Sequence, residues 1–128
     1  MSYYFSKIVP LGFDDAVKRT IEALKREGFG IITEIDVKDT LKKKLNIDFR
    51  DYRILGACNP ALAHEALQIE DKVGTMLPCN VVVQDVGGGR TEIAAIDPVA
   101  SMQAIENQRL KQAAVRVQAK LKKVIDDL

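Results

Sequence analysis

The stretch LPCNVVVQDVGGGRTEIAAI, residues 77–96, decides the fold class of this chain. Two runs rich in β-branched residues flank three consecutive glycines, a pattern typical of an antiparallel hairpin with a short turn. Pro78 stands at the start of the first run, where a missing backbone N–H is tolerated in a strand. GGGR lacks the lysine and the Ser or Thr of a phosphate-binding loop and lies between strands, so we interpret it as the hairpin turn.

Strands and helices alternate on the N-terminal side of this hairpin. The β-branched and aromatic content of residues 3–9, 29–35 and 52–58 predicts three further strands. From Asp14 onward, apolar residues recur at steps of three and four, which predicts a helix between the first two strands. Asp36 is expected to cap a short helix that extends through residue 45.

The end of the first helix is marked by two signals. Gly28 follows the last periodic residues, where a left-handed C′ residue is usually glycine. Phe29 then occupies C″ and is expected to contact Leu24 in a Schellman closure.

The C-terminal region is expected to be helical. Asp97 and Pro98 begin a short segment, and Asn107 is expected to cap a long helix. Apolar residues step by four and three along that helix and form a narrow seam, which is expected to lie on the sheet; the alternative adds a partner helix across a two-fold axis, since one helix can serve both surfaces. The seam consists of Leu110, Ala114, Val117, Leu121, Val124 and Leu128.

This order of elements predicts an α+β fold rather than a parallel, doubly wound sheet. We expect a two-layer sandwich: a mainly antiparallel sheet with helices on one face, and a long C-terminal helix. No linker or low-complexity tract interrupts the pattern, so residues 1–128 are expected to form a single domain.

Composition argues against two classes of partner. The 19 Lys and Arg residues nearly balance the 18 Asp and Glu residues, for a net charge of +1, and a nucleic-acid-binding protein usually has a basic excess. No apolar run approaches the roughly 20 residues of a membrane span, and no secretory signal is recognisable. Two cysteines without an export signal indicate a reducing compartment, so we expect a cytoplasmic protein without disulfides.

Residues 56–67, GACNPALAHEAL, contain the most varied chemistry in the chain. Asn59 and Pro60 make a favourable helix start, because Asn caps a free N–H and proline at N1 sacrifices no needed donor. His64 falls on the polar side of the following helix, away from Cys58, and is expected to face solvent or a partner.

Cys58 precedes the predicted helix start, where free N–H groups and the helix dipole favour a thiolate. If the strands that contain Cys58 and Cys79 are adjacent and antiparallel, the two thiols are neighbours; if the strands are parallel, they lie at opposite edges. Buried small side chains, a redox couple and two ligands of a thiophilic metal all remain open. A zinc ion needs four ligands, so Asp97 or a second subunit would have to complete a metal site.

No recognised catalytic signature is present. Neither Gly-x-Ser-x-Gly nor His-Glu-x-x-His occurs, and a single histidine makes a serine-type triad improbable. A non-enzymatic role is therefore the stronger expectation.

Four segments, GFGIITEIDVKDTLKKKL, YRILGACNPALAHEAL, GTMLPCNVVV and AAIDP, resemble in order and spacing the bacterial and archaeal family catalogued as domain of unknown function 302. The resemblance extends from about residue 5 to about residue 124. It implies a compact two-layer α+β domain, similar in layout to TATA-box-binding-protein-like folds, with members that form homodimers. It adds no reaction, because the family has no established activity, and the cofactor stays unknown. By position, Cys58, Asn59, Pro60, Cys79 and the Asp97-Pro98 pair match the family's signature.

Three hypotheses for function follow. The first is a homodimeric domain that binds a small molecule or metal ion beside Cys58 and Cys79, with Asn59 and Asp97 as further candidate ligand-binding residues. The second is a thiol-dependent redox enzyme that uses Cys58. The third is a structural protein–protein interaction domain that uses the C-terminal seam.

Overall fold

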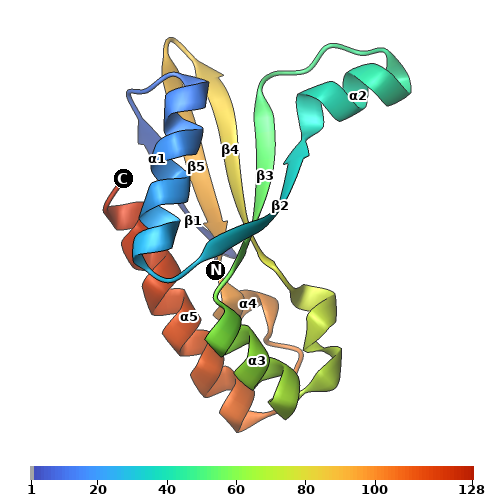
Figure 1. The fold of residues 1–128 in the computed structure, drawn as a ribbon, viewed down its shortest axis with the longest axis vertical. Coiled ribbons are helices and arrows are strands. Elements are labelled where there is room, and N and C mark those ends of the chain that lie inside the picture. Colours follow the sequence, from blue (N-terminus) through green and yellow to red (C-terminus); the bar gives the residue numbers. More distant parts are fainter. Residues whose placement is uncertain (1) are drawn as a thin grey trace.

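The computed structural model describes residues 2–128, and its centre is a five-stranded antiparallel sheet (Figure 1). The strands lie in the order β1-β5-β4-β3-β2. They are β1 (Tyr4–Val9), β2 (Gly30–Asp36), β3 (Tyr52–Cys58), β4 (Cys79–Gly87) and β5 (Arg90–Ile96). The helices are α1 (Phe13–Arg26), α2 (Val37–Leu45), α3 (Pro60–Ile69), the 3-10 helix η1 (Asp71–Met76), α4 (Pro98–Ser101) and α5 (Gln108–Asp126).

The hairpin expected from residues 77–96 is confirmed as β4 and β5. Val83 pairs with Ile93 in the middle of the ladder, and the register shifts between Asp85 and Gly87. Gly87, Gly88 and Gly89 all have positive φ, between 66° and 85°, which explains the glycine run because other residues rarely adopt this conformation.

The end of α1 also agrees with the sequence. Gly28 has φ of 85°, and its N–H donates to the carbonyl of Lys25 at 3.0 Å. The N–H of Phe29 donates to the carbonyl of Leu24 at 2.9 Å. These two bonds are the pair that defines a Schellman closure, and they direct the chain from α1 into β2.

Four helices begin at the side chains that the sequence indicated. In each case a side-chain oxygen accepts a hydrogen bond from a backbone N–H of the first turn, which satisfies a donor that the helix itself leaves free. The four capping residues are Asp36 for α2, Asn59 for α3, Asp97 for α4 and Asn107 for α5.

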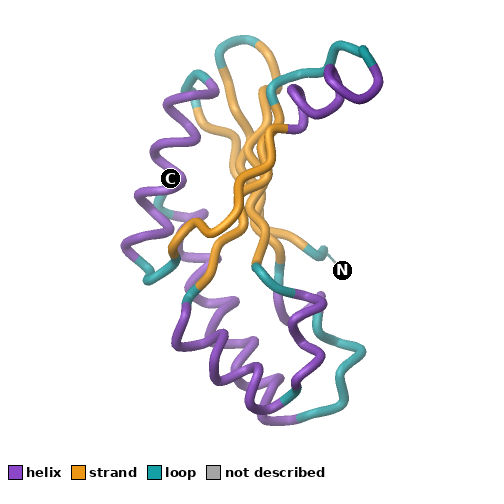
Figure 2. Tube along the Cα trace, turned by 45° about the vertical axis from the view of Figure 1, so that its right-hand side comes forward, coloured by secondary structure: helices purple, strands orange, loops and turns teal. Residues whose placement is uncertain are grey.

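Helices α1 and α5 pack on one face of the sheet, and the main hydrophobic core lies between these layers (Figures 1 and 2). The seam of α5 takes part in this core: Leu121 and Val124 are fully buried. The first half of the seam, at Leu110 and Ala114, packs in a second cluster with α3 and η1. The seam is therefore covered by the chain's own elements, as the first of its two interpretations expected.

In the described part of the chain, the opposite face of the sheet has no helix packed on it, and we call it the open face. It is formed by alternate residues of the strands, such as Tyr4 and Ile8 of β1 and Val82 of β4; Val82 lies between Val81 and Val83, which are fully buried in the core on the other side. Helix α2 and the loop that returns to β3, residues 37–51, project beyond the sheet; we call this segment the arm (Figure 1).

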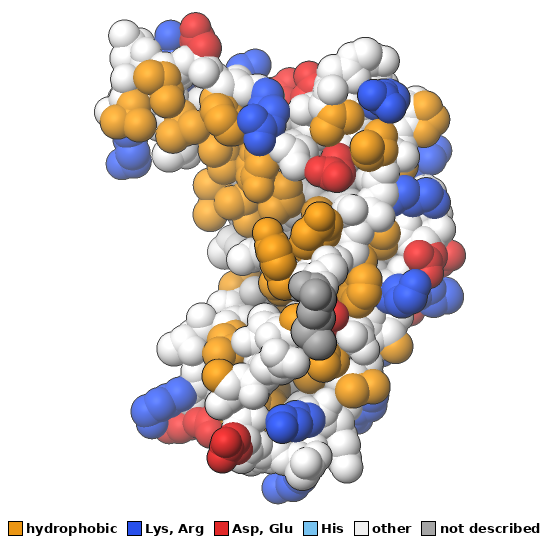
Figure 3. All heavy atoms as spheres, turned by 180° about the vertical axis from the view of Figure 1, so that it is seen from behind, with side chains coloured by type: hydrophobic (Ala, Val, Ile, Leu, Met, Phe, Trp, Pro, Cys, Tyr) orange, Lys and Arg blue, Asp and Glu red, His pale blue; other side chains and the backbone are white. Residues whose placement is uncertain are grey.

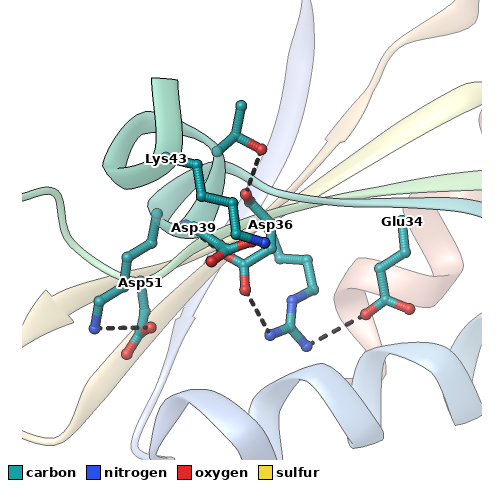
Figure 4. A network of polar contacts seen from close by, with 8 residues as sticks. Glu34, Asp36, Asp39, Lys43 and Asp51 are labelled. Carbon is teal, nitrogen blue, oxygen red and sulfur yellow. Dashed lines mark hydrogen bonds and ion pairs between the residues drawn. The ribbon is translucent and has the colours of Figure 1, made fainter. Parts of the chain in front are cut away.

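Ion pairs fix the base of the arm (Figure 4). Arg53 of β3 contacts Glu34 at 3.3 Å and Asp36 at 3.7 Å, and its guanidinium lies 5.3 Å from the ring centroid of Phe13. Lys38 of α2 contacts Asp51 at 3.6 Å. The pairs of Arg53 join β2 to β3 where α2 begins, and the pair of Lys38 joins α2 to the end of its own loop; such pairs contribute little stability singly. No helix within residues 2–128 is long and apolar enough to cross a membrane.

Candidate functional site

A cavity of about 320 Å³ lies where the two hydrophobic clusters meet. The end of β3, the start of β4, helix α3 and the middle of α5 form its walls. Its lining is almost entirely apolar, and includes Phe29, Met102 and Val117. Leu67 and Ile32 also line it and are exposed at 42% and 61%, so the cavity opens to solvent at its rim.

Both cysteines line this cavity. β3 and β4 are adjacent and antiparallel, and Cys79 lies opposite Ala57, the residue before Cys58. The two cysteines are therefore neighbours, as expected for adjacent antiparallel strands. Both thiols are free, without a disulfide; Cys58 is half-buried and Cys79 is buried.

Asn59 also lines the cavity. Its Oδ1 accepts the N–H of Leu62 at 3.3 Å, as a helix cap does. The side chain rests against the turn after α1, because a Cβ at Gly28 would lie 3.0 Å from Asn59 Nδ2. Asn59 therefore joins the start of α3 to the end of α1, and its amide is the main polar side chain at the cavity.

Asp97, the fourth candidate, is not among the cavity-lining residues of the described chain. Its Oδ1 accepts the N–H of Val99 at 3.0 Å, and its two oxygens accept Nε2 of Gln118 at 3.1 and 3.2 Å. Its carboxylate thus caps α4 and joins it to α5. His64 is exposed on α3, as its position on the helical wheel predicted.

A metal site completed by carboxylates is not formed. Within residues 2–128, no group of three or more His, Cys, Asp or Glu side chains is arranged to hold a metal ion. Two thiols alone leave a tetrahedral metal ion two ligands short.

Replacing Asp97 by alanine is expected to destabilise the fold by about 1–2 kcal/mol, because the cap of α4 and the link to Gln118 are lost together. The midpoint of urea unfolding measures this change. Asp97→Asn keeps an oxygen acceptor and should recover most of the loss; equal losses in both variants would contradict the proposed role of the cap.

The environment of Cys79 opposes its ionisation. Burial raises the pKa of its thiol from 9.0 to about 11, and the neighbouring Cys58 adds to the rise. Cys79 is therefore a protonated, apolar-like lining residue at neutral pH, rather than a nucleophile.

This raised pKa predicts a loss of stability at alkaline pH. The unfolded chain releases the thiol proton near pH 9 and the folded chain only near pH 11, so stability is complete below pH 9 and falls between these values. The difference corresponds to roughly 2–3 kcal/mol. Urea unfolding of the wild-type chain and of Cys79→Ser, compared at each pH, isolates this contribution because serine does not ionise. Parallel pH profiles for the two proteins would contradict it.

The two cysteines and Asn59 can be identified as candidates from the sequence, but most of the cavity cannot. Its other walls come from residues such as Phe29, Met102 and Val117, which are distant along the chain and look like ordinary core residues. No local pattern distinguishes a residue that fills a core from one that lines a hollow within it.

The chain is similar to a known protein family and to a solved structure. The family model for Domain of unknown function DUF302 matches residues 5–128. The crystal structure of an uncharacterized conserved DUF302 protein from Bacillus stearothermophilus is 30% identical, with a TM-score of 0.90, and 98% of each chain is covered. No curated protein matches this sequence. The chain therefore belongs to the DUF302 family of domains of unknown function.

Proposed function

We propose that this domain binds a small, uncharged, largely apolar molecule in the cavity beside Cys58 and Cys79. The observation that supports the proposal most strongly is the cavity itself: about 320 Å³ lined by apolar side chains in an otherwise packed fold. Ligand sites are typically of about 300–1,000 Å³, mostly apolar, with a few placed polar groups. Core voids of this size are otherwise rare, because protein interiors pack as densely as organic crystals.

The chemistry of the lining limits the class of ligand. Among residues 2–128, no charged side chain lines the cavity, so an ionised group would lose its hydration without a partner. Asn59 already accepts a hydrogen bond through Oδ1, which leaves its Nδ2 as the donor that can meet a carbonyl or ether oxygen. The thiols and the thioether of Met102 are polarizable and suit an aromatic or unsaturated group.

Two alanines on α3 provide a matched test. Ala63 lines the cavity, whereas Ala61 is exposed on the same helix and does not. Ala63→Phe should fill the cavity, and Ala61→Phe adds the same ring to the surface. The probe is the neutral dye N-phenyl-1-naphthylamine, whose fluorescence rises on transfer to an apolar site.

The wild-type chain and Ala61→Phe should bind the dye saturably at one site, and Ala63→Phe should bind it roughly tenfold more weakly or worse, because dense interiors leave no room for both rings. Circular dichroism and thermal unfolding establish that each variant is folded. Equal binding by all three proteins, or no binding by the wild type, would overturn the proposal.

A thiol-dependent reaction is the second candidate, and Cys58 is the residue that favours it. Its side chain is half-buried, lines the cavity and directly precedes the capping residue of the ten-residue helix α3. Reaction with an aryl disulfide at neutral pH tests this: Cys58 must react faster than free cysteine, and Cys58→Ser must abolish the reaction. A rate at or below that of free cysteine removes the candidate.

A further inference from the structure

We propose that Cys58 and Cys79 are a reversible oxidation site: a hydroperoxide joins the two thiols in a disulfide, and this disulfide closes the cavity to its ligand. The oxidation itself depends only on the two cysteines. Its effect on binding rests on the ligand site proposed above and adds a means of regulating that site.

The strand register brings the two cysteines within disulfide distance. β3 runs into α3, and η1 returns the chain to β4, so the end of one strand lies beside the start of the other (Figure 1). Cys79 lies opposite Ala57, and Cys58 is the next residue. A cross-strand spacing of about 5 Å and a rise of about 3.4 Å place the Cα atoms of the two cysteines about 6 Å apart. Disulfides join Cα atoms that lie about 4.4–6.8 Å apart, so the link needs no large backbone movement.

Both side chains line the same space. Strand alternation alone would turn Cys58 to the opposite face from Cys79. However, β3 ends at Cys58, where the chain turns into α3, and both cysteines line the cavity. The charge of an ionised Cys58 also contributes to the raised pKa of Cys79, which requires the two sulfurs to be close. The chain contains only these two cysteines, and both are free, so each has only the other as an intramolecular partner.

The difference in burial assigns a separate step to each thiol. Cys58 is half-buried and is reached first by a hydroperoxide, whereas Cys79 is buried and its raised pKa keeps it protonated at neutral pH. The sulfur of Cys58 attacks a peroxide oxygen and breaks the O–O bond; Cys58 becomes a sulfenic acid, and the other oxygen takes up the thiol proton and leaves as water or an alcohol.

Cys79 then resolves the sulfenic acid. Its sulfur attacks the sulfur of Cys58, the S–S bond forms, the S–O bond breaks, and the hydroxyl leaves with the proton of Cys79 as water. Two thiols are thereby oxidised and one hydroperoxide is reduced. Because the two residues lie on adjacent strands, this step has a high effective concentration and outcompetes further oxidation of Cys58 or its linkage to a second chain. A small thiol such as glutathione reverses the reaction by thiol–disulfide exchange.

The disulfide closes the cavity from within. To reach Cys79, the sulfur of Cys58 must turn from its half-buried position toward the buried wall, into space that the ligand would occupy. Asn59 follows directly, and its Oδ1 accepts the N–H of Leu62 at 3.3 Å, which is long for such a bond. A shift of Cys58 is therefore transmitted to the main polar side chain at the cavity. Both changes reduce the fit of a ligand.

The oxidation is tested on the chain alone. The reduced chain is treated with hydrogen peroxide at neutral pH, and its thiols are counted with an aryl disulfide after denaturation. The count should fall from two to none while the chain stays single on a non-reducing gel, and the peptides that contain Cys58 and Cys79 should become linked with loss of two hydrogen atoms. Dithiothreitol should restore both thiols. Cys58→Ser and Cys79→Ser are the matched controls, because neither can form this link. Wild-type cysteines that gain oxygen, or that link different chains instead, would overturn the proposal.

Closing of the cavity is measured with N-phenyl-1-naphthylamine. Exposed apolar side chains on the open face and the arm, seen from behind in Figure 3, are a further surface on which the dye can adsorb, so the signal of Ala63→Phe is subtracted. The oxidised chain should bind the dye roughly tenfold more weakly than the reduced chain, and dithiothreitol should restore binding. Cys58→Ser treated with the same peroxide should bind the dye as the reduced wild type does.

The outcomes distinguish this inference from the ligand site. Equal binding by the reduced and oxidised chains, with the disulfide formed, would overturn the closing of the cavity and leave the ligand site standing. No binding by the reduced chain would overturn the ligand site and its regulation together. An equal loss of binding in peroxide-treated Cys58→Ser would mean that the oxidant acts elsewhere, such as on the Met102 thioether that also lines the cavity, and would overturn the proposal as well.

Discussion

Replacing Phe29 by alanine is expected to lower the free energy of unfolding by about 3–5 kcal/mol. The ring of Phe29 is only 2% exposed, lies in the main hydrophobic core and forms one wall of the cavity. Its removal loses apolar burial and extends an existing cavity, so the surrounding side chains cannot close the gap. The backbone bond from Phe29 to Leu24 survives, so the effect measures the side chain.

Phe49 provides the matched control for this truncation. It lies in the arm, half-buried, and its ring contacts Arg50 and Tyr52 rather than the core. Phe49→Ala should cost about 1 kcal/mol or less, in line with other partly exposed substitutions. Urea unfolding compares the two variants. Similar losses at both positions would mean that Phe29 is not part of a tightly packed core.

Replacing Gly56 by alanine is expected to destabilise the chain by about 1–3 kcal/mol or more, although the change adds one methyl group. A Cβ at Gly56 would lie 2.0 Å from Oγ1 of Thr33 and 2.8 Å from Cγ of Pro78. Thr33 faces Gly56 across the β2–β3 ladder, at a point where the register shifts. The side chain of Thr33 and the ring of Pro78 must both shift to admit the methyl group.

Gly30 supplies the control, because a Cβ there meets no atom within 4 Å and its φ is not positive. Gly30→Ala should leave the stability nearly unchanged or raise it slightly by restricting the unfolded chain. Adding Thr33→Ala to Gly56→Ala removes the closest contact and should recover part of the loss. Full stability of Gly56→Ala alone would contradict the close approach of β2 and β3.

The sequence predicts those parts of the fold that depend on local chemistry. Caps, glycine turns and the hairpin are read from a few adjacent residues, and the bounds 52–58 of β3 are recovered without error. Helix η1 was missed because residues 71–76 have no clear apolar period and include Gly74. The strand order could not be predicted either, because packing between distant segments determines it.

In the candidate site, too, local features can be predicted from the sequence and contacts between distant segments cannot. Cys58, Asn59 and Cys79 line one cavity because β3 and β4 are antiparallel, whereas the sequence alone left parallel and antiparallel pairing both open. Asp97 is correctly identified as a cap, but its carboxylate meets Gln118, twenty-one positions away, rather than the cavity. A carboxylate in a helix cap has the same sequence pattern whether or not it also contacts a ligand.

The proposed ligand site is tested most directly by native mass spectrometry of freshly purified protein under reducing conditions. We expect the wild-type chain to retain an added organic mass, and Ala63→Phe prepared in the same way to lack it. The mass also separates an organic molecule from a metal ion. A bare chain in the wild type, or an added mass that Ala63→Phe retains, would contradict a ligand in the cavity beside Cys58 and Cys79.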